Sequence, residues 1–274
     1  YYRKSRAFLK IQDGCDQYCS YCIIPYARGR QRSAQLIDVV NQATKLAKTT
    51  KEIVLTGIHT GRYFDGEHHL VDLLKEIDKI EGLETIRLSS IEISEITDEL
   101  LDYMKKSKKM AHHLHIPLQA GSNHILKLMN RPYTVEDYIK RVEEIRQAIP
   151  NISISTDLIV GFPMESEEDF SETLKSLKKI GFSFIHIFPY SRKKGTKADS
   201  FSGHLSNEVK KSREKAVMSL QKDFSQAYKD RQVNTNGVLL KLKILKIKKL
   251  HFVMFQLMAI LKNISTPKLK VNIK

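Results

Sequence analysis

Apolar residues along most of the chain follow two different spacings. Short runs rich in β-branched residues, such as 152–160, predict buried strands. Between them, apolar residues recur at helical spacing, as Leu36, Val39, Ala43 and Leu46 do. The expected strands are 7–12, 52–56, 85–89, 113–117, 152–160 and 184–188, and the expected helices are 34–49, 70–80, 97–106, 125–129, 135–148, 167–180 and 207–231.

The order of these elements predicts the fold class. Six strand-then-helix units in succession favour an α/β protein with a parallel sheet. Right-handed crossovers then curl the sheet into an open (β/α)6 partial barrel. By analogy with closed α/β barrels, we expect the chemistry at the carboxyl ends of the strands.

Composition divides the chain into three parts. We expect a core domain over 1–204, a charged linking helix over 205–232 and a separate region over 233–274. This last region is rich in Lys, Ile and Leu and contains almost no Gly, Asp or Glu after Gly237. We expect it to be a small, incomplete β-type appendage.

The net charge of +15 favours a polyanionic partner such as nucleic acid. The alternative is a generally lysine-rich protein whose charges cover solvated helix faces, as Lys175, Lys178 and Lys179 do. The longest apolar run, 252–261, is interrupted by Gln256 and is too short to span a bilayer, so we expect no membrane partner. Unpaired thiols and the lack of a targeting pattern favour the reducing cytoplasm.

All three cysteines of the chain, Cys15, Cys19 and Cys22, lie within eight residues. Three thiolates at this spacing can hold three irons of one [4Fe-4S] cluster and leave the fourth iron open, since such a cluster normally takes four thiolates. Tyr21 is placed to shield the cluster from water. A disulfide framework needs an even count of cysteines. A structural zinc site needs a fourth ligand, for example His59 or His115.

The cysteine motif, with an aromatic residue before its third cysteine, resembles the signature of the radical S-adenosylmethionine (SAM) enzymes. LKIQDGCDQYCSYCIIPYARGRQRS (9–33) is similar to the cluster loop of the methylthiotransferases. EIVLTGIHTG (52–61), HLHIPLQAGSNHILKLMNRPYT (113–134) and STDLIVGFPMESEEDF (155–170) resemble the group that acts on threonylcarbamoyladenosine in tRNA. The resemblance covers residues 5–232.

The resemblance implies a mechanism and partners. SAM chelates the open iron, a reductant such as flavodoxin or ferredoxin supplies one electron, and a 5′-deoxyadenosyl radical forms. Such enzymes also carry an N-terminal domain with a second cluster and a C-terminal RNA-binding barrel called TRAM. Judged by this pattern, the chain is a fragment without the former and with an aberrant form of the latter. We therefore expect weak tRNA binding, incomplete sulfur transfer and a monomer.

The resemblance also assigns residues to SAM. Gly57, His59 and Gly61 follow a strand and are expected near its methionine group; the glycines alone would also suit a tight turn. Gln119 is a candidate for its ribose or carboxylate. Arg131 is a candidate partner for the carboxylate, with an ordinary surface role as the alternative.

A second strand-to-helix turn completes the expected SAM pocket. Asp157, Gly161 and Glu165 bracket this turn, and Ile159-x-Gly161-x3-Glu165 resembles the adenine-site pattern of radical SAM enzymes. Glu165 has an alternative role as a cap for the helix that begins near Glu167. No side chain is assigned as a catalytic acid or base.

Two other functions fit part of this pattern. One is a methylthiotransferase that acts on an aspartate of a ribosomal protein, although LTGIHTG (55–61) favours the tRNA enzyme. The other is a non-catalytic, zinc-stabilised RNA-binding module. Iron content and visible absorption distinguish the second from an enzyme.

Overall fold

The computed structural model describes residues 6–232. The expected appendage over 233–274 and the first five residues lie outside this range. Six parallel strands run through the described part in chain order. They are β1 (Arg6–Lys10), β4 (Glu52–Thr56), β5 (Thr85–Leu88), β6 (His113–His115), β7 (Ser153–Val160) and β8 (Phe184–Pro189).

The six strands form two three-stranded parallel sheets, ordered β1-β4-β5 and β6-β7-β8. A parallel bridge between Ile86 and Met110 joins them, and Ile91 N–H donates to the carbonyl of His115 at 3.0 Å. Two short strands, β2 (Gln12–Asp13) and β3 (Arg32–Ser33), pair antiparallel beside them. The prediction of an α/β fold with an open parallel sheet is confirmed.

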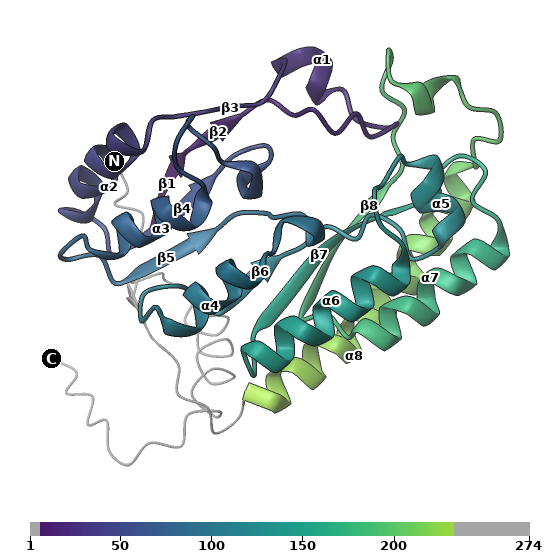
Figure 1. Cartoon of the computed structure of the whole chain (residues 1–274). Coiled ribbons are helices and arrows are strands. Elements are labelled where there is room, and N and C mark those ends of the chain that lie inside the picture. The colour runs from purple at the N-terminus through teal and green to yellow at the C-terminus, as the bar shows by residue number, and fades with distance from the viewer. Residues whose placement is uncertain (1–5, 233–274) are drawn as a thin grey trace, which may run out of the picture.

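Helices connect the parallel strands and cover one face of the sheets (Figure 1). The crossover helices are α2 (Leu36–Ala47), α3 (Leu70–Asp78), α4 (Asp98–Lys106), α6 (Val135–Ala148) and α7 (Glu167–Ile180). Two short helices, α1 (Ile24–Arg28) and α5 (Asn123–Leu128), lie in loops, as do the 3-10 turns η1 (Thr60–Arg62), η2 (Ile93–Glu95) and η3 (Lys197–Ser200). The long α8 (Asn207–Gln232) packs against β8. None of the helices in residues 6–232 has the length and apolar character needed to cross a membrane.

Capping residues explain where the best-defined helices begin and end. Thr134 and Ser166 each accept the N–H three residues ahead, from Asp137 and Asp169, whose carboxylates accept the N–H of the cap in return. These reciprocal bonds satisfy two N–H groups that a helix start otherwise leaves unpaired. Gly181 ends α7 in the left-handed conformation, which suits glycine.

The two faces of the second sheet differ in burial. Leu114, Ile154, Leu158 and Ile185 point toward the helices and are at most 2% exposed. On the opposite face, His115 and Asp157 are half-buried, and His186 is exposed. Since successive residues of a strand point to opposite faces, this alternation leaves a polar surface on the concave side of the sheet.

Candidate active site around the cysteine loop

The cysteine loop is closed at its neck by the β2–β3 pair, in which Gln12 faces Ser33 and Asp13 faces Arg32. The side-chain amide of Gln12 donates to the carbonyl of Gly14 at 2.8 Å, and its oxygen accepts the N–H of His59 at 2.8 Å. This buried amide thus ties the loop to the segment that follows β4.

Gly14 allows the backbone at the start of the loop to lie close to the backbone at its end. It has a φ of 74°, and a Cβ at this position would lie 2.1 Å from the carbonyl oxygen of Arg30. Gly29 has the same φ of 74°, but a Cβ there would meet no atom within 4 Å. A comparison of the alanine variants of Gly14 and Gly29 therefore separates the effect of backbone strain from that of a steric clash.

We predict that Gly14→Ala lowers the iron bound after reconstitution far more than Gly29→Ala does. Both substitutions place a side chain at positive φ, at a cost of about 1–3 kcal/mol. Gly14→Ala must in addition displace the Arg30 backbone and open the neck. Iron content per chain, measured on both variants, checks this; equal loss would show that only the strain matters.

The three thiols are free and half-buried. The N–H of Cys22 donates to the carbonyl of Cys19 at 3.0 Å, which fixes the turn between these two cysteines. Three N–H donors approach the sulfurs: the N–H of Gln17 lies 3.4 Å from the Cys15 sulfur, and His59 and Arg131 each approach one thiol. Because cluster thiolates are negative and accept hydrogen bonds, this donor set fits an iron–sulfur cluster.

His59 links the first cysteine to a carboxylate. Its Nδ1 lies 3.7 Å from the Cys15 sulfur, and its Nε2 lies 2.6 Å from Glu95. Burial alone would lower the pKa of His59, but the hydrogen bonds to Cys15 and Glu95 raise it to about 9. Burial likewise opposes ionisation of Cys15, yet the bonds from His59 and Gln17 bring its pKa below the ordinary value. A protonated His59 can donate to both partners at pH 7.

Arg131 serves the second cysteine in the same way. Its guanidinium donates to the Cys19 sulfur at 3.3 Å, to Tyr133 Oη at 3.1 Å and to the Glu92 carboxylate. The side chain is only 2% exposed, so the alternative of an ordinary surface role is wrong. Burial raises the pKa of Cys19 even though Arg131 opposes this rise.

Gly57 and Gly61 are required by close packing. A Cβ on Gly57 would lie 2.9 Å from the Gln12 side-chain oxygen, and one on Gly61 would lie 2.3 Å from a Glu95 carboxylate oxygen. Neither glycine has a positive φ. The two glycines therefore let the loop after β4 approach the residues that hold the cysteine loop.

Tyr21 and Gln119 each contact a residue in the segment 157–162. Tyr21 is half-buried and packs edge-on against Phe162, with ring centroids 6.4 Å apart. Gln119 has a φ of 65° and follows β6. Its N–H donates to the carbonyl of Asp157 at 2.9 Å, and its carbonyl accepts the N–H of Ile159 at 2.9 Å. The backbone of Gln119 thus extends the pairing with β7.

The turn after β7 is joined to helix α8. Glu165 accepts the N–H of Gly161 at 2.7 Å and forms an ion pair with Arg213; both side chains are 4% exposed or less. Gly161 has a φ of 71°, and a Cβ there would lie 2.4 Å from Cγ of Lys210. The alternative of Glu165 as the cap of α7 is wrong, because Ser166 fills that role.

Sequence reasoning missed several of these residues. Glu92 and Glu95 follow β5, so their place after a strand was a usable signal. Nothing in the sequence marks Gln12 and Tyr133 as part of the site, because their roles depend on distant segments of the chain. Arg213 looked like one of many charges on a solvated helix.

The Asp157 side chain pairs with a histidine of the second sheet. Its Oδ1 lies 3.2 Å from His115 Nε2 on the concave face of the second sheet. The site therefore gathers the three cysteines, His59, Arg131 and the two glycines after β4, while Asp157 belongs to a separate cluster.

The family model for the radical SAM superfamily matches residues 9–177, which include the end of β1, the cysteine loop and the parallel strands β4 to β7. The chain belongs to the radical SAM superfamily. This membership displaces the alternative of a zinc-stabilised module. Solved radical SAM enzymes share the fold: coproporphyrinogen III oxidase from Escherichia coli superposes with a TM-score of 0.61 at 17% identity, over 80% of this chain and 52% of that one.

Curated relatives are more similar in sequence. Threonylcarbamoyladenosine tRNA methylthiotransferase is 47% identical in Aquifex aeolicus, over 83% of this chain and 56% of the relative. The enzyme of the same name from Bacillus subtilis is 43% identical, over 84% of this chain and 52% of the relative. The tRNA-2-methylthio-N(6)-dimethylallyladenosine synthase of Thermodesulfovibrio yellowstonii is 43% identical, over 81% and 52%. The chain spans about half the length of these relatives.

Proposed function

We propose that the chain is the radical SAM core of a tRNA methylthiotransferase that modifies threonylcarbamoyladenosine next to the anticodon. The observation that carries this proposal is the cysteine loop, in which three thiols meet the buried donors His59 and Arg131. Identity of 43% and 47% to relatives of that name supports the substrate. The relatives compared above are all named for tRNA, which favours tRNA over a ribosomal protein.

Cys15, Cys19 and Cys22 are proposed to hold a [4Fe-4S] cluster, which when bound supplies the electron for reductive cleavage of SAM. His59 and Arg131 then donate to the ligating sulfurs and add positive charge beside them. Glu95 orients His59 and Glu92 orients Arg131, each through an ion pair. Since hydrogen bonds to the sulfurs set the reduction potential, these donors also tune the electron transfer.

The SAM pocket is proposed to lie between the loop after β4 and the turns after β6 and β7. Gly57 and Gly61 let the loop after β4 lie close to the cysteine loop, where its backbone carbonyls can accept from the methionine ammonium. Gln119 and Arg131 offer polar partners for the ribose and carboxylate of SAM. Gly161 and Glu165 form the adenine side, and Tyr21 covers the cluster from water. Asp157 contributes through its carbonyl, which holds the backbone of Gln119.

The net charge of +15 supports a tRNA partner, because phosphate binding releases counterions. A one-electron protein donor such as flavodoxin or ferredoxin is the proposed reductant, and a monomer is the proposed state. A TRAM-like role for residues 233–274 concerns residues outside the described range.

We predict that the reconstituted, reduced chain cleaves SAM to 5′-deoxyadenosine. The measurement is deoxyadenosine by chromatography, with Cys19→Ala as the matched control. If the wild-type chain gives no more product than this control, the chain has no radical SAM activity.

The same assay tests the substrate. Cleavage should rise with tRNA that carries threonylcarbamoyladenosine, and rise less with tRNA that carries dimethylallyladenosine. A larger rise with the latter would reassign the nucleoside, and a rise with ribosomal protein alone would reassign the substrate class.

We predict that this 274-residue chain alone forms no methylthio nucleoside. Transfer needs a second sulfur-bearing site, and the chain has only three cysteines, all in one loop. The experiment incubates chain, SAM, reductant, sulfide and threonylcarbamoyladenosine tRNA, followed by mass spectrometry of the nucleosides. Multiple-turnover product would show that one cluster suffices.

A further inference from the structure

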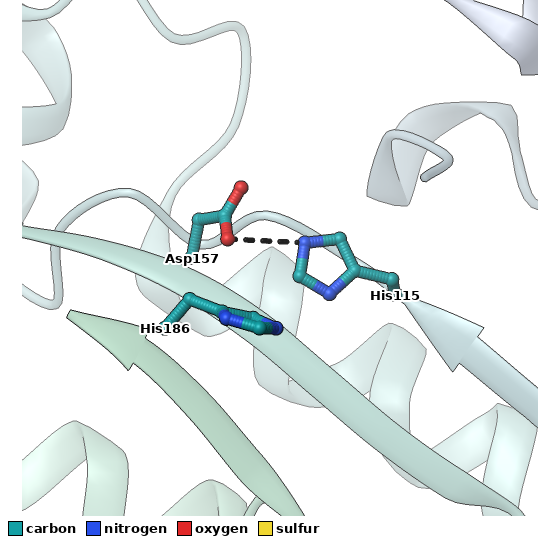
Figure 2. A group of neighbouring side chains, drawn as sticks. All are labelled: His115, Asp157 and His186. Atoms are coloured by element: carbon teal, nitrogen blue, oxygen red, sulfur yellow. Dashed lines mark ion pairs between the residues drawn. The ribbon is translucent and has the colours of Figure 1, made fainter. Parts of the chain in front are cut away.

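Two imidazoles and one carboxylate meet on the concave face of the second sheet (Figure 2). Asp157 of β7 lies directly opposite His186 of β8, and His115 of β6 lies opposite Ser155, two residues before Asp157. Because alternate residues of a strand share a face, all three side chains project to the same side. One ligand atom from each lies within 4.8 Å of the other two.

We propose that His115, Asp157 and His186 bind one divalent transition-metal ion of the zinc class. Zinc takes imidazole nitrogen and carboxylate oxygen at about 2.0–2.2 Å, so two tetrahedral ligand atoms lie about 3.3 Å apart. His115 Nε2 and Asp157 Oδ1 are already 3.2 Å apart. Three protein ligands leave a fourth position for water or for an oxygen of a bound molecule.

A hydroxyl behind His115 is placed to orient the ring. Ser155 Oγ lies 2.9 Å from His115 Nδ1 and 3.2 Å from His113 Nε2. A metal-binding histidine usually donates its other ring N–H to an oxygen, which fixes the tautomer. With Nδ1–H donating to Ser155, Nε2 of His115 is free to ligate.

The ion can reach the three ligands from solvent at His186. It lies on the edge strand β8 and is exposed, while its ring packs edge-on against His115 at 5.4 Å and Phe184 at 4.7 Å between centroids. The two ring contacts hold the imidazole beside its partner ligands. The site is therefore open to solvent on one side and supported by packing on the other.

The test titrates Zn²⁺ into the full chain with Cys15, Cys19 and Cys22 all changed to alanine, because the thiols would themselves bind zinc. Calorimetry should show one equivalent bound. His115→Ala, His186→Ala and Asp157→Asn should each weaken binding by 100-fold or more. Ser155→Ala should weaken it by about 10- to 100-fold, the usual effect of losing such an orienting group.

His112→Ala is the matched control, since this exposed histidine precedes β6 and lies outside the cluster. It should leave zinc affinity unchanged, and Co²⁺ should give an intense tetrahedral visible spectrum that His186→Ala abolishes. The exposure of His186 makes this variant safe for folding, which circular dichroism checks. Absence of zinc binding, or equal binding by His186→Ala, overturns the proposal. Neither result depends on SAM cleavage.

Discussion

Replacing Cys15, Cys19 or Cys22 by alanine is expected to abolish the stable cluster that anaerobic reconstitution installs. The unaltered chain should bind about four irons, and the chain offers no other thiol to replace a lost ligand. The measurements are iron and sulfide content and the visible charge-transfer absorption. A near-complete loss is expected for each variant, because two thiolates cannot retain the cluster.

Gln17→Ala provides the control for these variants. Gln17 lies in the same loop, and only its backbone N–H approaches the Cys15 sulfur, so the substitution keeps that contact. It should retain the iron and the absorption. Absence of iron and of the visible band in the reconstituted, unaltered chain would contradict the assignment of the loop to a cluster.

The alternation of strands and helices was predictable because each element buries one face. Residues 52–56, 135–148 and 167–180 were predicted with the bounds that the structure has. The two helices among these each follow a residue whose side chain accepts an N–H bond, and such caps can be seen in sequence. Strong apolar periodicity together with a capping residue is therefore enough to predict the bounds of a helix from its own segment of sequence.

The neck of the cysteine loop was not predictable in the same way. The β2–β3 pair has two residues per strand, and α1 has five, so neither shows a period. The conformation at the start of the loop depends on Gln12, whose buried amide bonds to Gly14 and His59. Such contacts exist only after the fold has brought the segment after β4 beside the loop.

The three cysteines stand out in the sequence by their spacing, whereas the groups that surround them do not. Arg131 was expected to contact SAM, but its link to Glu92 and the Cys19 sulfur joins residues 39 and 112 positions away. Carboxylates such as Glu92 look like solvated charges in sequence. Glu92 has a structural role because its partner Arg131 is buried, and the burial of Arg131 is set by the fold.

Arg213→Ala is expected to cost about 3–5 kcal/mol of unfolding free energy at neutral pH. The substitution leaves the buried Glu165 carboxylate without its charged partner, and breaking a buried pair has a cost of this size. Arg213 also donates to the carbonyls of Glu165 and Ser166, so the variant loses further hydrogen bonds. Chemical denaturation measures the effect.

Lys211→Ala is the matched control, since Lys211 is two positions away on the same helix and is exposed. It should change the unfolding free energy by less than about 0.5 kcal/mol. The double variant Glu165→Gln with Arg213→Met should recover much of the lost stability, because no unpaired charge then remains buried. If Arg213→Ala unfolds like Lys211→Ala, the ion pair does not hold α8 to the turn after β7. In that case Gly161 and Lys210 would have to hold that turn by packing alone.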